Sequence, residues 1–280
     1  MTQPDKFLLA GVMGWPVMHS RSPLIHNHWL AKHGLAGSYV PLAIKSEGLA
    51  AALRALPALG FSGCNVTIPH KQEAMKIVDE VQESARLIGA ISCVSVRPDG
   101  GLVGSNNDAF GFIRNLRQQQ PRWRAEDGPA VVIGAGGGSR AVCYGLLQEG
   151  VREVRIVNRS LVRARELAQA FGGAVQAVDW AQRHDALAGA ALLVNTTSQG
   201  MVGQGVLDLA LDQLPLSAVV ADIVYVPLIT PLLAAARSRG NPIVDGLGML
   251  LHQGPLAWKV WFGIEPEVTA ELRELVERSL

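Results

Sequence analysis

Residues 131–141, VVIGAGGGSRA, constrain the fold more than any other stretch of this chain. An apolar run ends in a glycine turn, and we expect a helix from about Ser139 to Gln148 directly after it. Such a turn lets backbone N–H groups and a helix N-terminus meet a pyrophosphate without side chains in the way. Because Ser139 stands where a third glycine is usual, a tight turn without a ligand is the alternative. The strand, turn, helix and second strand together favour a dinucleotide-binding unit.

Short β-type runs alternate with helical patterns along most of the chain, which is typical of α/β folds. Before the glycine turn we expect strands at 7–14, 38–44 and 63–69, helices at 22–33 and 47–56, a hairpin at 91–104 turning at Asp99-Gly100, and a helix at 109–119. After it we expect strands at 153–159, 174–178, 191–197 and 218–225, a helix at 161–171, and a mostly helical tail from Gly246. The polar stretch 117–130 is interpreted as a surface loop near a domain boundary. The second series has the rhythm of a doubly wound parallel sheet.

Length and composition narrow the class of protein. The 280 residues suggest two domains or one large one, and 49% hydrophobic with 18% charged residues is globular composition. With 25 basic and 24 acidic residues, there is no electrostatic reason to expect nucleic acid or an anionic membrane as a partner. No stretch has the pattern of a signal peptide or membrane span, so we expect a cytoplasmic protein that binds a small molecule. His19, His26 and His28 have no second ligand cluster, so no metal site is expected.

The end of the strand at 153–159 indicates which dinucleotide is bound. An NAD site normally has an acidic residue here, about 20 residues after the glycine turn, to bind the ribose 2′-hydroxyl. This chain instead has Asn158, Arg159 and Ser160, followed by Arg163. Arginine can bind a 2′-phosphate through charge-assisted hydrogen bonds, which favours NADP. Solvated arginines at a helix start are the alternative.

Two polar residues are candidates for catalysis. Lys71 follows the strand-like run of NVTIPHK, residues 65–71, and ligands bind at the carboxyl ends of strands in α/β folds. A lone lysine is usually a solvated surface cation, so Lys71 needs a carboxylate near it to qualify. Asp108, in GSNND, could be that carboxylate, although an aspartate before a helix often serves only as its cap.

Eight motifs resemble those of the shikimate dehydrogenase family, in family order across nearly the whole chain. They are HSRSPLIHN (19–27), NVTIPHK (65–71), NDAFGF (107–112), IGAGGGSRA (133–141), VNRS (157–160), NTTSQGM (195–201), DIVYVPLITPLL (222–233) and DGLGMLLHQ (245–253). The resemblance implies an α/β fold with an N-terminal α/β substrate domain, residues 1–108 plus 246–280, and a Rossmann-type doubly wound NADP-binding domain, residues 109–245. It also implies reversible hydride transfer from NADPH to the ketone of 3-dehydroshikimate.

The resemblance implies roles for particular residues. Lys71 and Asp108 match the catalytic lysine and aspartate. The expected substrate ligands are Ser20 and Ser22 for the carboxylate, Thr67 near it, and Ser92, Asn107, Tyr225 and Gln253. The expected cofactor ligands are Gly134, Ala135, Gly136, Gly137, Gly138, Asn158, Arg159, Ser160 and Arg163, with Ile223 and Gly246 lining the nicotinamide site.

Two positions depart from the family pattern. Family members typically read GAVNT where this chain reads GAISC (89–93), so Ser92 replaces an asparagine; they read NTDG where this chain reads NNDA (106–109), so Asn107 replaces a threonine. An unpaired polar group in a closed site costs about 1–3 kcal/mol, so we expect an altered rate or substrate preference. The alternatives are therefore a quinate or aminoshikimate dehydrogenase, or a sensor that binds NADP or a ligand without catalysis. The chain is expected to be a monomer or a homodimer.

Overall fold

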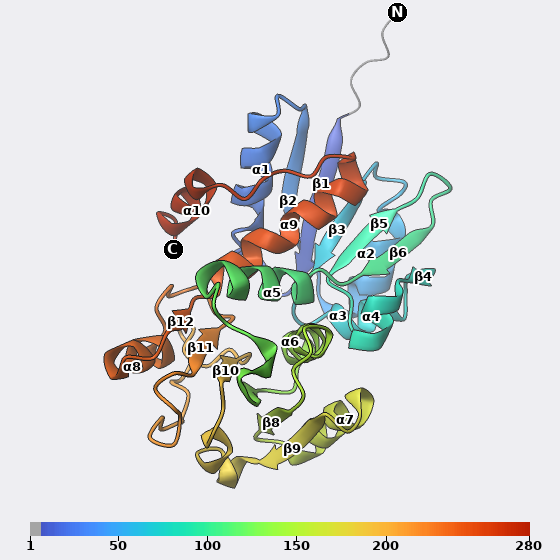
Figure 1. Ribbon diagram of the computed structural model, residues 1–280. Coiled ribbons are helices and arrows are strands. Elements are labelled where there is room, and N and C mark those ends of the chain that lie inside the picture. Colours follow the sequence, from blue (N-terminus) through green and yellow to red (C-terminus); the bar gives the residue numbers. More distant parts are fainter. Residues whose placement is uncertain (1–6) are drawn as a thin grey trace, which may run out of the picture. The chain divides into compact units, whose positions relative to one another are not determined.

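The computed structural model describes residues 7–280, and within it the chain forms two compact units. The first unit runs up to Asn107 and includes Leu250–Ser279; the second comprises Asp108–Met249. Each has its own six-stranded sheet (Figure 1).

The first unit is a mixed sheet with helices. Its sheet has the order β2-β1-β3-β5-β6-β4. β1 pairs in parallel with β2 and β3, whereas β5 is antiparallel to both β3 and β6. The elements are β1 Leu8–Gly14, α1 Ser22–Lys32, β2 Gly37–Ala43, α2 Leu49–Ala55, β3 Gly63–Val66, α3 Lys71–Met75, β4 Glu80–Val81, α4 Glu83–Ile88, β5 Cys93–Val96, β6 Leu102–Ser105, and α10 Ala270–Glu277.

The long helix α9, Leu247–Phe262, belongs to the first unit from Leu250 on. Trp261 donates from its indole nitrogen to the Val94 carbonyl of β5 at 3.0 Å. Gly254 lies so close to Trp29 of α1 that a Cβ atom there would be 2.6 Å from the ring. The C-terminal part of α9 therefore packs against both the sheet and α1 of this unit.

The second unit has an all-parallel sheet of order β12-β11-β10-β7-β8-β9. The chain starts at its middle strand and reverses direction between β7 and β10, which is the Rossmann arrangement. The elements are α5 Asp108–Gln119, β7 Ala130–Ile133, α6 Gly137–Gln148, β8 Val154–Asn158, α7 Leu161–Phe171, β9 Val175–Asp179, β10 Leu192–Asn195, β11 Val219–Asp222, α8 Pro231–Arg239, and β12 Ile243–Val244.

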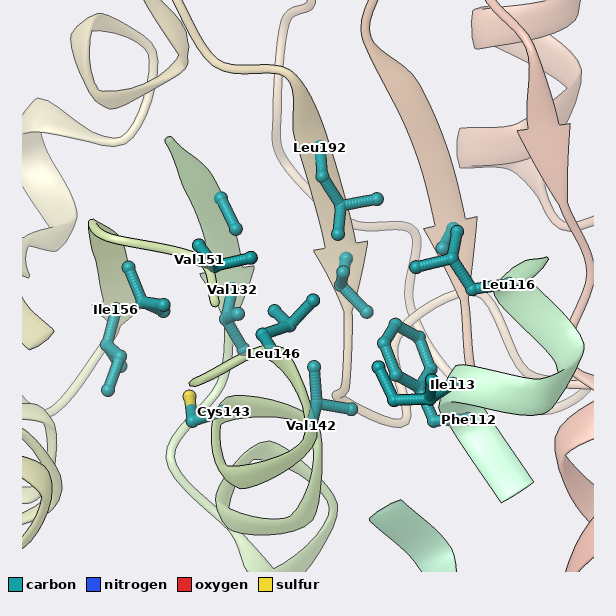
Figure 2. Close-up of a cluster of buried hydrophobic side chains, with 14 of the residues drawn as sticks. Phe112, Ile113, Leu116, Val132, Val142, Cys143, Leu146, Val151, Ile156 and Leu192 are labelled. Atoms are coloured by element: carbon teal, nitrogen blue, oxygen red, sulfur yellow. The ribbon is translucent and has the colours of Figure 1, made fainter. Parts of the chain in front are cut away.

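Apolar side chains of α5 and α6 form the core on one face of this parallel sheet (Figure 2). Phe112 and Leu116 of α5 and Leu146 of α6 are almost completely buried, together with Val132 of β7 and Leu192 of β10. A second apolar cluster, which includes Leu233 of α8, Val131 of β7 and Val220 of β11, contains residues that alternate with the first set along the strands. Helices thus cover both faces of the sheet, as its apolar strands require.

The expected fold class is confirmed, and the differences lie in one helix, in short elements and in element ends. The nine-residue helix α8 was not predicted, nor were α3, α4, β4 and β12, which have six residues or fewer. The strands predicted at 63–69 and 218–225 end at Val66 and Asp222, because the chain leaves each sheet at a loop that contains a proline. α6 begins at Gly137, two residues earlier than expected. No helix within residues 7–280 is long and apolar enough to cross a membrane.

Candidate active site

The glycine turn of the second unit joins β7 to α6. Gly134 has a φ of 115°, and a Cβ atom there would lie 2.7 Å from the Thr196 hydroxyl, so only glycine suits this position. Ala135, Gly136 and Gly137 follow, and Gly137 opens α6. The twelve-residue helix therefore directs its N-terminus to the carboxyl edge of the sheet, where backbone N–H groups and the helix dipole favour an anion.

Ser139, which stands in place of the third glycine, is completely buried and ties the turn together. Its hydroxyl accepts a hydrogen bond from the Gly136 amide at 3.3 Å and lies 2.5 Å from the Thr196 hydroxyl. Thr196 in turn donates to the Ile133 carbonyl at 2.6 Å. The serine thus connects the turn to the loop that follows β10, without a side chain projecting into the ligand's path.

The end of β8 presents positive charge to solvent. The Asn158 amide donates to the Ser160 carbonyl at 2.9 Å, and the Ser160 hydroxyl caps α7 by accepting from the Arg163 amide at 3.5 Å. The side chains of Arg159 and Arg163 are exposed, and within the described part of the chain neither forms an ion pair. Both guanidinium groups are available for an anionic ligand.

Three of the expected cofactor residues lie together where the loop after β11 meets the start of α6: Gly138, Ile223 and Gly246. Ile223 follows β11, and a Cβ atom on Gly138 would lie 2.8 Å from its Cδ1 atom. A Cβ atom on Gly246 would lie 2.6 Å from the Ile223 carbonyl oxygen. The chain thus brings Ile223 against both glycines: Gly138 leaves room for its side chain, and Gly246 for its backbone carbonyl.

In the first unit a line of buried polar groups crosses the sheet from α1 to β3. The Ser22 hydroxyl hydrogen-bonds the Tyr39 side chain, and the Tyr39 hydroxyl donates to Asn65 Oδ1 at 2.7 Å. Burial raises the pKa of Tyr39 well above its usual value, so the phenol stays neutral and able to donate. The Asn65 amide then donates to the Ser92 carbonyl at 3.2 Å. One expected substrate ligand, Ser22, is therefore held in place from inside the unit.

The two departures from the family pattern contact each other. The Ser92 hydroxyl accepts from the Asn107 backbone amide at 2.9 Å, and the Asn107 side chain donates to the Gln253 carbonyl at 3.3 Å. Ser92 and Asn107 are both buried. β5 starts and β6 ends at this point, which brings the two residues together although they are 15 positions apart.

Lys71, Thr67 and Ser20 also belong to the first unit. Lys71 is half-buried and is the first residue of α3, with its carbonyl accepting from the Ile91 amide at 3.0 Å. Thr67 lies just beyond the end of β3, and its amide donates to the Met13 carbonyl at 2.9 Å. The Ser20 hydroxyl accepts from the Ser22 amide at 3.2 Å, so the two serines form one turn before α1.

Asp108 and Tyr225 belong to the second unit. Asp108 is only 1% exposed and is the first residue of α5. The carboxylate therefore lies in the first helical turn, where the helix dipole favours a negative charge, and not at the cap position before the helix. Tyr225 is half-buried in the loop after β11.

Sequence reasoning missed Tyr39, Asn65 and Asp222. All three are buried polar residues, and each hydrogen-bonds groups distant in sequence. Asn65 had a signal, because it interrupts an apolar strand within a motif already singled out. Among residues 7–280, no group of three or more His, Cys, Asp or Glu side chains is arranged to hold a metal ion.

Comparison with known proteins identifies the family. The model of the shikimate dehydrogenase substrate binding domain matches residues 12–94, and the shikimate/quinate 5-dehydrogenase model matches residues 116–224. The shikimate dehydrogenase (NADP(+)) of Paramagnetospirillum magneticum is 56% identical over 97% of this chain and 98% of its own length. The chain belongs to the shikimate dehydrogenase family. The enzyme with the same name from Rhodospirillum rubrum is 55% identical, with 97% of each chain covered.

Solved structures of this family share the fold. Shikimate 5-dehydrogenase from Thermus thermophilus, in complex with NADP(H) and shikimate, has a TM-score of 0.87 and 36% identity, covering 98% of this chain and 100% of its own. Quinate dehydrogenase from Corynebacterium glutamicum, in complex with NAD, has a TM-score of 0.90 and 33% identity, covering 98% and 99%. The predicted family and enzyme class, an oxidoreductase acting on a CH–OH group, are therefore confirmed.

Proposed function

We propose that this protein catalyses the NADP-dependent, reversible reduction of 3-dehydroshikimate to shikimate. The observation that carries the proposal is its 56% identity, over nearly the full length of both chains, to a shikimate dehydrogenase (NADP(+)). The glycine turn and the basic end of β8 support it independently, because they provide the two anion sites that NADP needs.

The residues present fit NADP. The N-terminus of α6 can hold the pyrophosphate, with Gly134 to Gly138 keeping the approach free of side chains. Arg159 and Arg163 can bind the 2′-phosphate, and Asn158 and Ser160 shape the loop that carries them. Ile223 and Gly246 are then placed to line the nicotinamide.

NADPH, when bound, supplies the hydride that adds to the ketone carbon. The negative charge that develops on the ketone oxygen must be stabilised where it appears. We assign this to Lys71, which either donates the proton to that oxygen or stays beside it as a cation. We assign the second catalytic role to Asp108, which matches the aspartate of the same family pattern. In the reverse direction the neutral amine of Lys71 accepts the proton from the substrate hydroxyl as hydride leaves its carbon; where Lys71 stays a cation, that proton passes to water.

The remaining polar residues orient the substrate. The Ser20 and Ser22 hydroxyls can donate to its carboxylate, Ser22 by exchanging the Tyr39 hydroxyl for the carboxylate as the acceptor of its single hydrogen. Thr67 lies beside this carboxylate. Asn107, Ser92, Tyr225 and Gln253 supply further contacts to the substrate.

A second candidate activity is the oxidation of quinate. Ser92 and Asn107 depart from the family pattern, and a quinate dehydrogenase is among the structural relatives. A hydroxyl reaches less far than an amide and has one donor fewer, so the pocket at Ser92 can admit a different ring substituent. An aminated shikimate is the other substrate to compare.

A steady-state assay tests the proposal. Purified protein is supplied with shikimate or quinate and with NADP⁺ or NAD⁺, and the formation of reduced cofactor is followed. The expected result is highest kcat/KM for shikimate with NADP⁺. Higher kcat/KM for quinate would favour the second candidate, and tight ligand binding without turnover of any pair would show a sensor. A cytoplasmic location remains a prediction, which cell fractionation can test. A monomeric or homodimeric state also remains a prediction, which light scattering can test.

A further inference from the structure

The second unit contains a buried carboxylate to which sequence reasoning gave no role. Asp222 is the last residue of β11 and is 2% exposed. Its carboxylate accepts hydrogen bonds from the Asn195 amide at 3.1 Å to each oxygen, from the Val224 backbone amide at 2.9 Å, and from the Thr230 hydroxyl at 2.8 Å. Four donor contacts therefore converge on one side chain.

Its partner Asn195, the last residue of β10, is completely buried, and both its side-chain oxygen and its side-chain nitrogen form hydrogen bonds. Asn195 Oδ1 accepts from the backbone amide and the hydroxyl of Thr197, at 3.1 and 2.8 Å. Asn195 Nδ2 also donates to the Gln199 carbonyl at 3.0 Å. The pair thus joins two loops, 195–201 after β10 and 222–230 after β11, at the carboxyl edge of the sheet.

The part of the second loop that Asp222 fixes is the part that touches the glycine turn. Ile223 donates from its amide to the Asn195 carbonyl at 3.0 Å, and its side chain packs on Gly138. The Val224 carbonyl lies where a Cβ atom on Gly246 would be 2.5 Å away. The position of Ile223 is therefore set by its own amide bond to Asn195, by the bond of the next amide, Val224, to the carboxylate, and by close contact with two glycines.

The topology indicates which end of the cofactor lies there. The pyrophosphate sits at α6, over the point where the strand order reverses between β7 and β10. The 2′-phosphate end extends toward β8, where Arg159 and Arg163 lie. The opposite end of an extended dinucleotide must then pass over β10 and β11, toward Ile223. Resting on the NADP site of the proposed function, we infer that Asp222 is a positioning residue that fixes Ile223 and thereby the seat of the nicotinamide ring.

A purely structural role does not require a carboxylate at this place. Within residues 7–280, the groups that donate to Asp222 are an amide side chain, a hydroxyl and a backbone amide, all of them neutral, and no ion pair includes it. Burial raises the pKa of Asp222 to about 6, so ionising it is unfavourable, although it is mostly ionised at pH 7. An ion retained at such a cost is consistent with a role in function.

The test uses two variants and two controls. Asp222→Asn turns an amide nitrogen toward that of Asn195. Thr230→Val keeps the shape but removes the donor to Asp222 and, with it, the oxygen that caps α8 by accepting from the Leu233 amide. Thr230→Ser keeps the hydroxyl and should behave as the unaltered protein. Asn241→Ala is the matched control for losing a buried network, because Asn241 is 4% exposed and its amide donates to three backbone carbonyls at the amino edge of the same sheet.

The measurement compares binding of NADP⁺ with binding of 2′,5′-ADP, which has the 2′-phosphate and adenosine but no nicotinamide. In Asp222→Asn and Thr230→Val we expect the dissociation constant of NADP⁺ to rise about tenfold while that of 2′,5′-ADP stays within about twofold. We expect kcat for shikimate oxidation to fall on the order of tenfold to a hundredfold, since small misplacements of a reacting group have such effects. Asn241→Ala should lower the melting temperature without changing the dissociation constant of either nucleotide.

Each outcome either supports or refutes the positioning role of Asp222. If Asp222→Asn does not fold, Thr230→Val provides the measurement. If both variants change NADP⁺ and 2′,5′-ADP binding equally, or change melting temperature alone as Asn241→Ala does, the positioning role is refuted. If the unaltered protein does not oxidise shikimate, the proposed function fails, but the comparison of the two nucleotides still decides the inference, because it uses binding alone.

Discussion

The two sheets collect their candidate site residues at one edge by different means. In the second unit β7, β8, β10 and β11 are parallel, so their carboxyl ends all lie at the same edge. In the first unit β5 runs antiparallel to β3 and β6, so its amino end meets their carboxyl ends. Ser92, before β5, thereby joins Asn107, after β6. Ligands bind at the carboxyl ends of strands in α/β folds. This rule predicts the place of the candidate cofactor residues in the second unit, but of only some of the candidate substrate residues in the first.

A second difference lies in how the polar residues are satisfied. In the second unit Asn158, Ser139 and Asn195 hydrogen-bond loop backbone, which shapes the cofactor loops from within. In the first unit Tyr39 of β2 and Asn65 of β3 support Ser22 through side chains that meet across β1. The second unit also has side-chain contacts of this kind, between Asn195 and Asp222, so exchanges of single side chains matter in both units.

The largest expected effect tests the catalytic group of the first unit. Lys71→Ala should lower kcat by about 10²–10⁴-fold, because it removes the proposed proton donor or cation at the reacting oxygen. NADP⁺ binding should not change, since the cofactor groups belong to the second unit. Lys76→Ala is the control, because Lys76 is an exposed lysine five residues away that pairs with Glu73 at the surface. Unchanged kcat in Lys71→Ala would refute its role.

The next effect tests the basic end of β8 in the second unit. Arg159→Ala should lower kcat/KM for NADP⁺ about tenfold or more while leaving that for NAD⁺ nearly unchanged, because a hydrogen bond to a charged group contributes about 1.5–3 kcal/mol. Arg165→Ala removes an equally exposed charge from α7 and serves as the control. Equal losses with both cofactors would show that Arg159 does not bind the 2′-phosphate.

How much could be predicted from sequence depends on how local the determining contacts are. α7 begins and ends where expected, at Leu161 and Phe171, since the Ser160 cap and Gly172 lie next to it. α3 was missed because five residues carry no helical period, and its place depends on burial of Ala74. The glycine turn, like α7, could be predicted from its local sequence.

The missed site residues depend on strand register. Tyr39 of β2 pairs with Ala10 of β1, and Asn65 of β3 pairs with Val12 of the same strand. Their hydrogen bond thus exists only because β1 separates them by one strand, which neither local sequence reveals. The contact between Asp222 and Thr230 is also not visible in the local sequence, because it depends on the shape that packing gives to the loop between them. Family resemblance could indicate ligands, but not the buried residues that hold them.

A smaller effect tests the contact between the two departures in the first unit. Ser92→Asn and Asn107→Thr should each change the ratio of kcat/KM for shikimate to that for quinate by about tenfold, which corresponds to about 1.4 kcal/mol and lies within the range of about 1–3 kcal/mol for one polar group. Because the Ser92 hydroxyl accepts from the Asn107 backbone amide, Ser92→Asn disturbs the backbone that carries the side chain of residue 107, so the double variant should differ from the sum of the single ones. Ser95→Ala, two residues beyond the start of β5, is the control. Strict additivity would mean that the two positions act separately.

The smallest effect contrasts the buried titratable groups of the two units. Burial lowers the pKa of His26 in the first unit from 6.5 to about 3 and raises that of Asp222 in the second from 3.8 to about 6. Between pH 7 and pH 5 the unfolded chain binds the proton at His26, which destabilises the first unit as pH falls. Over the same window the folded state binds the proton at Asp222, which stabilises the second unit. Each change is on the order of 1 kcal/mol.

These opposite signs largely cancel in a measurement on the whole protein, so the two units must be observed separately. Hydrogen exchange of amides in β3 and β10, corrected for intrinsic rates, gives the local opening free energy of each unit at pH 7 and pH 5. His26→Gln should flatten the change in β3 alone, and Asp222→Asn that in β10 alone. The Trp258 indole donates to His26 Nδ1 at 2.7 Å, so a proton on that nitrogen has no acceptor and the first unit is the one that loosens in acid. Changes of equal sign in both strands would contradict the opposed burial of the two groups.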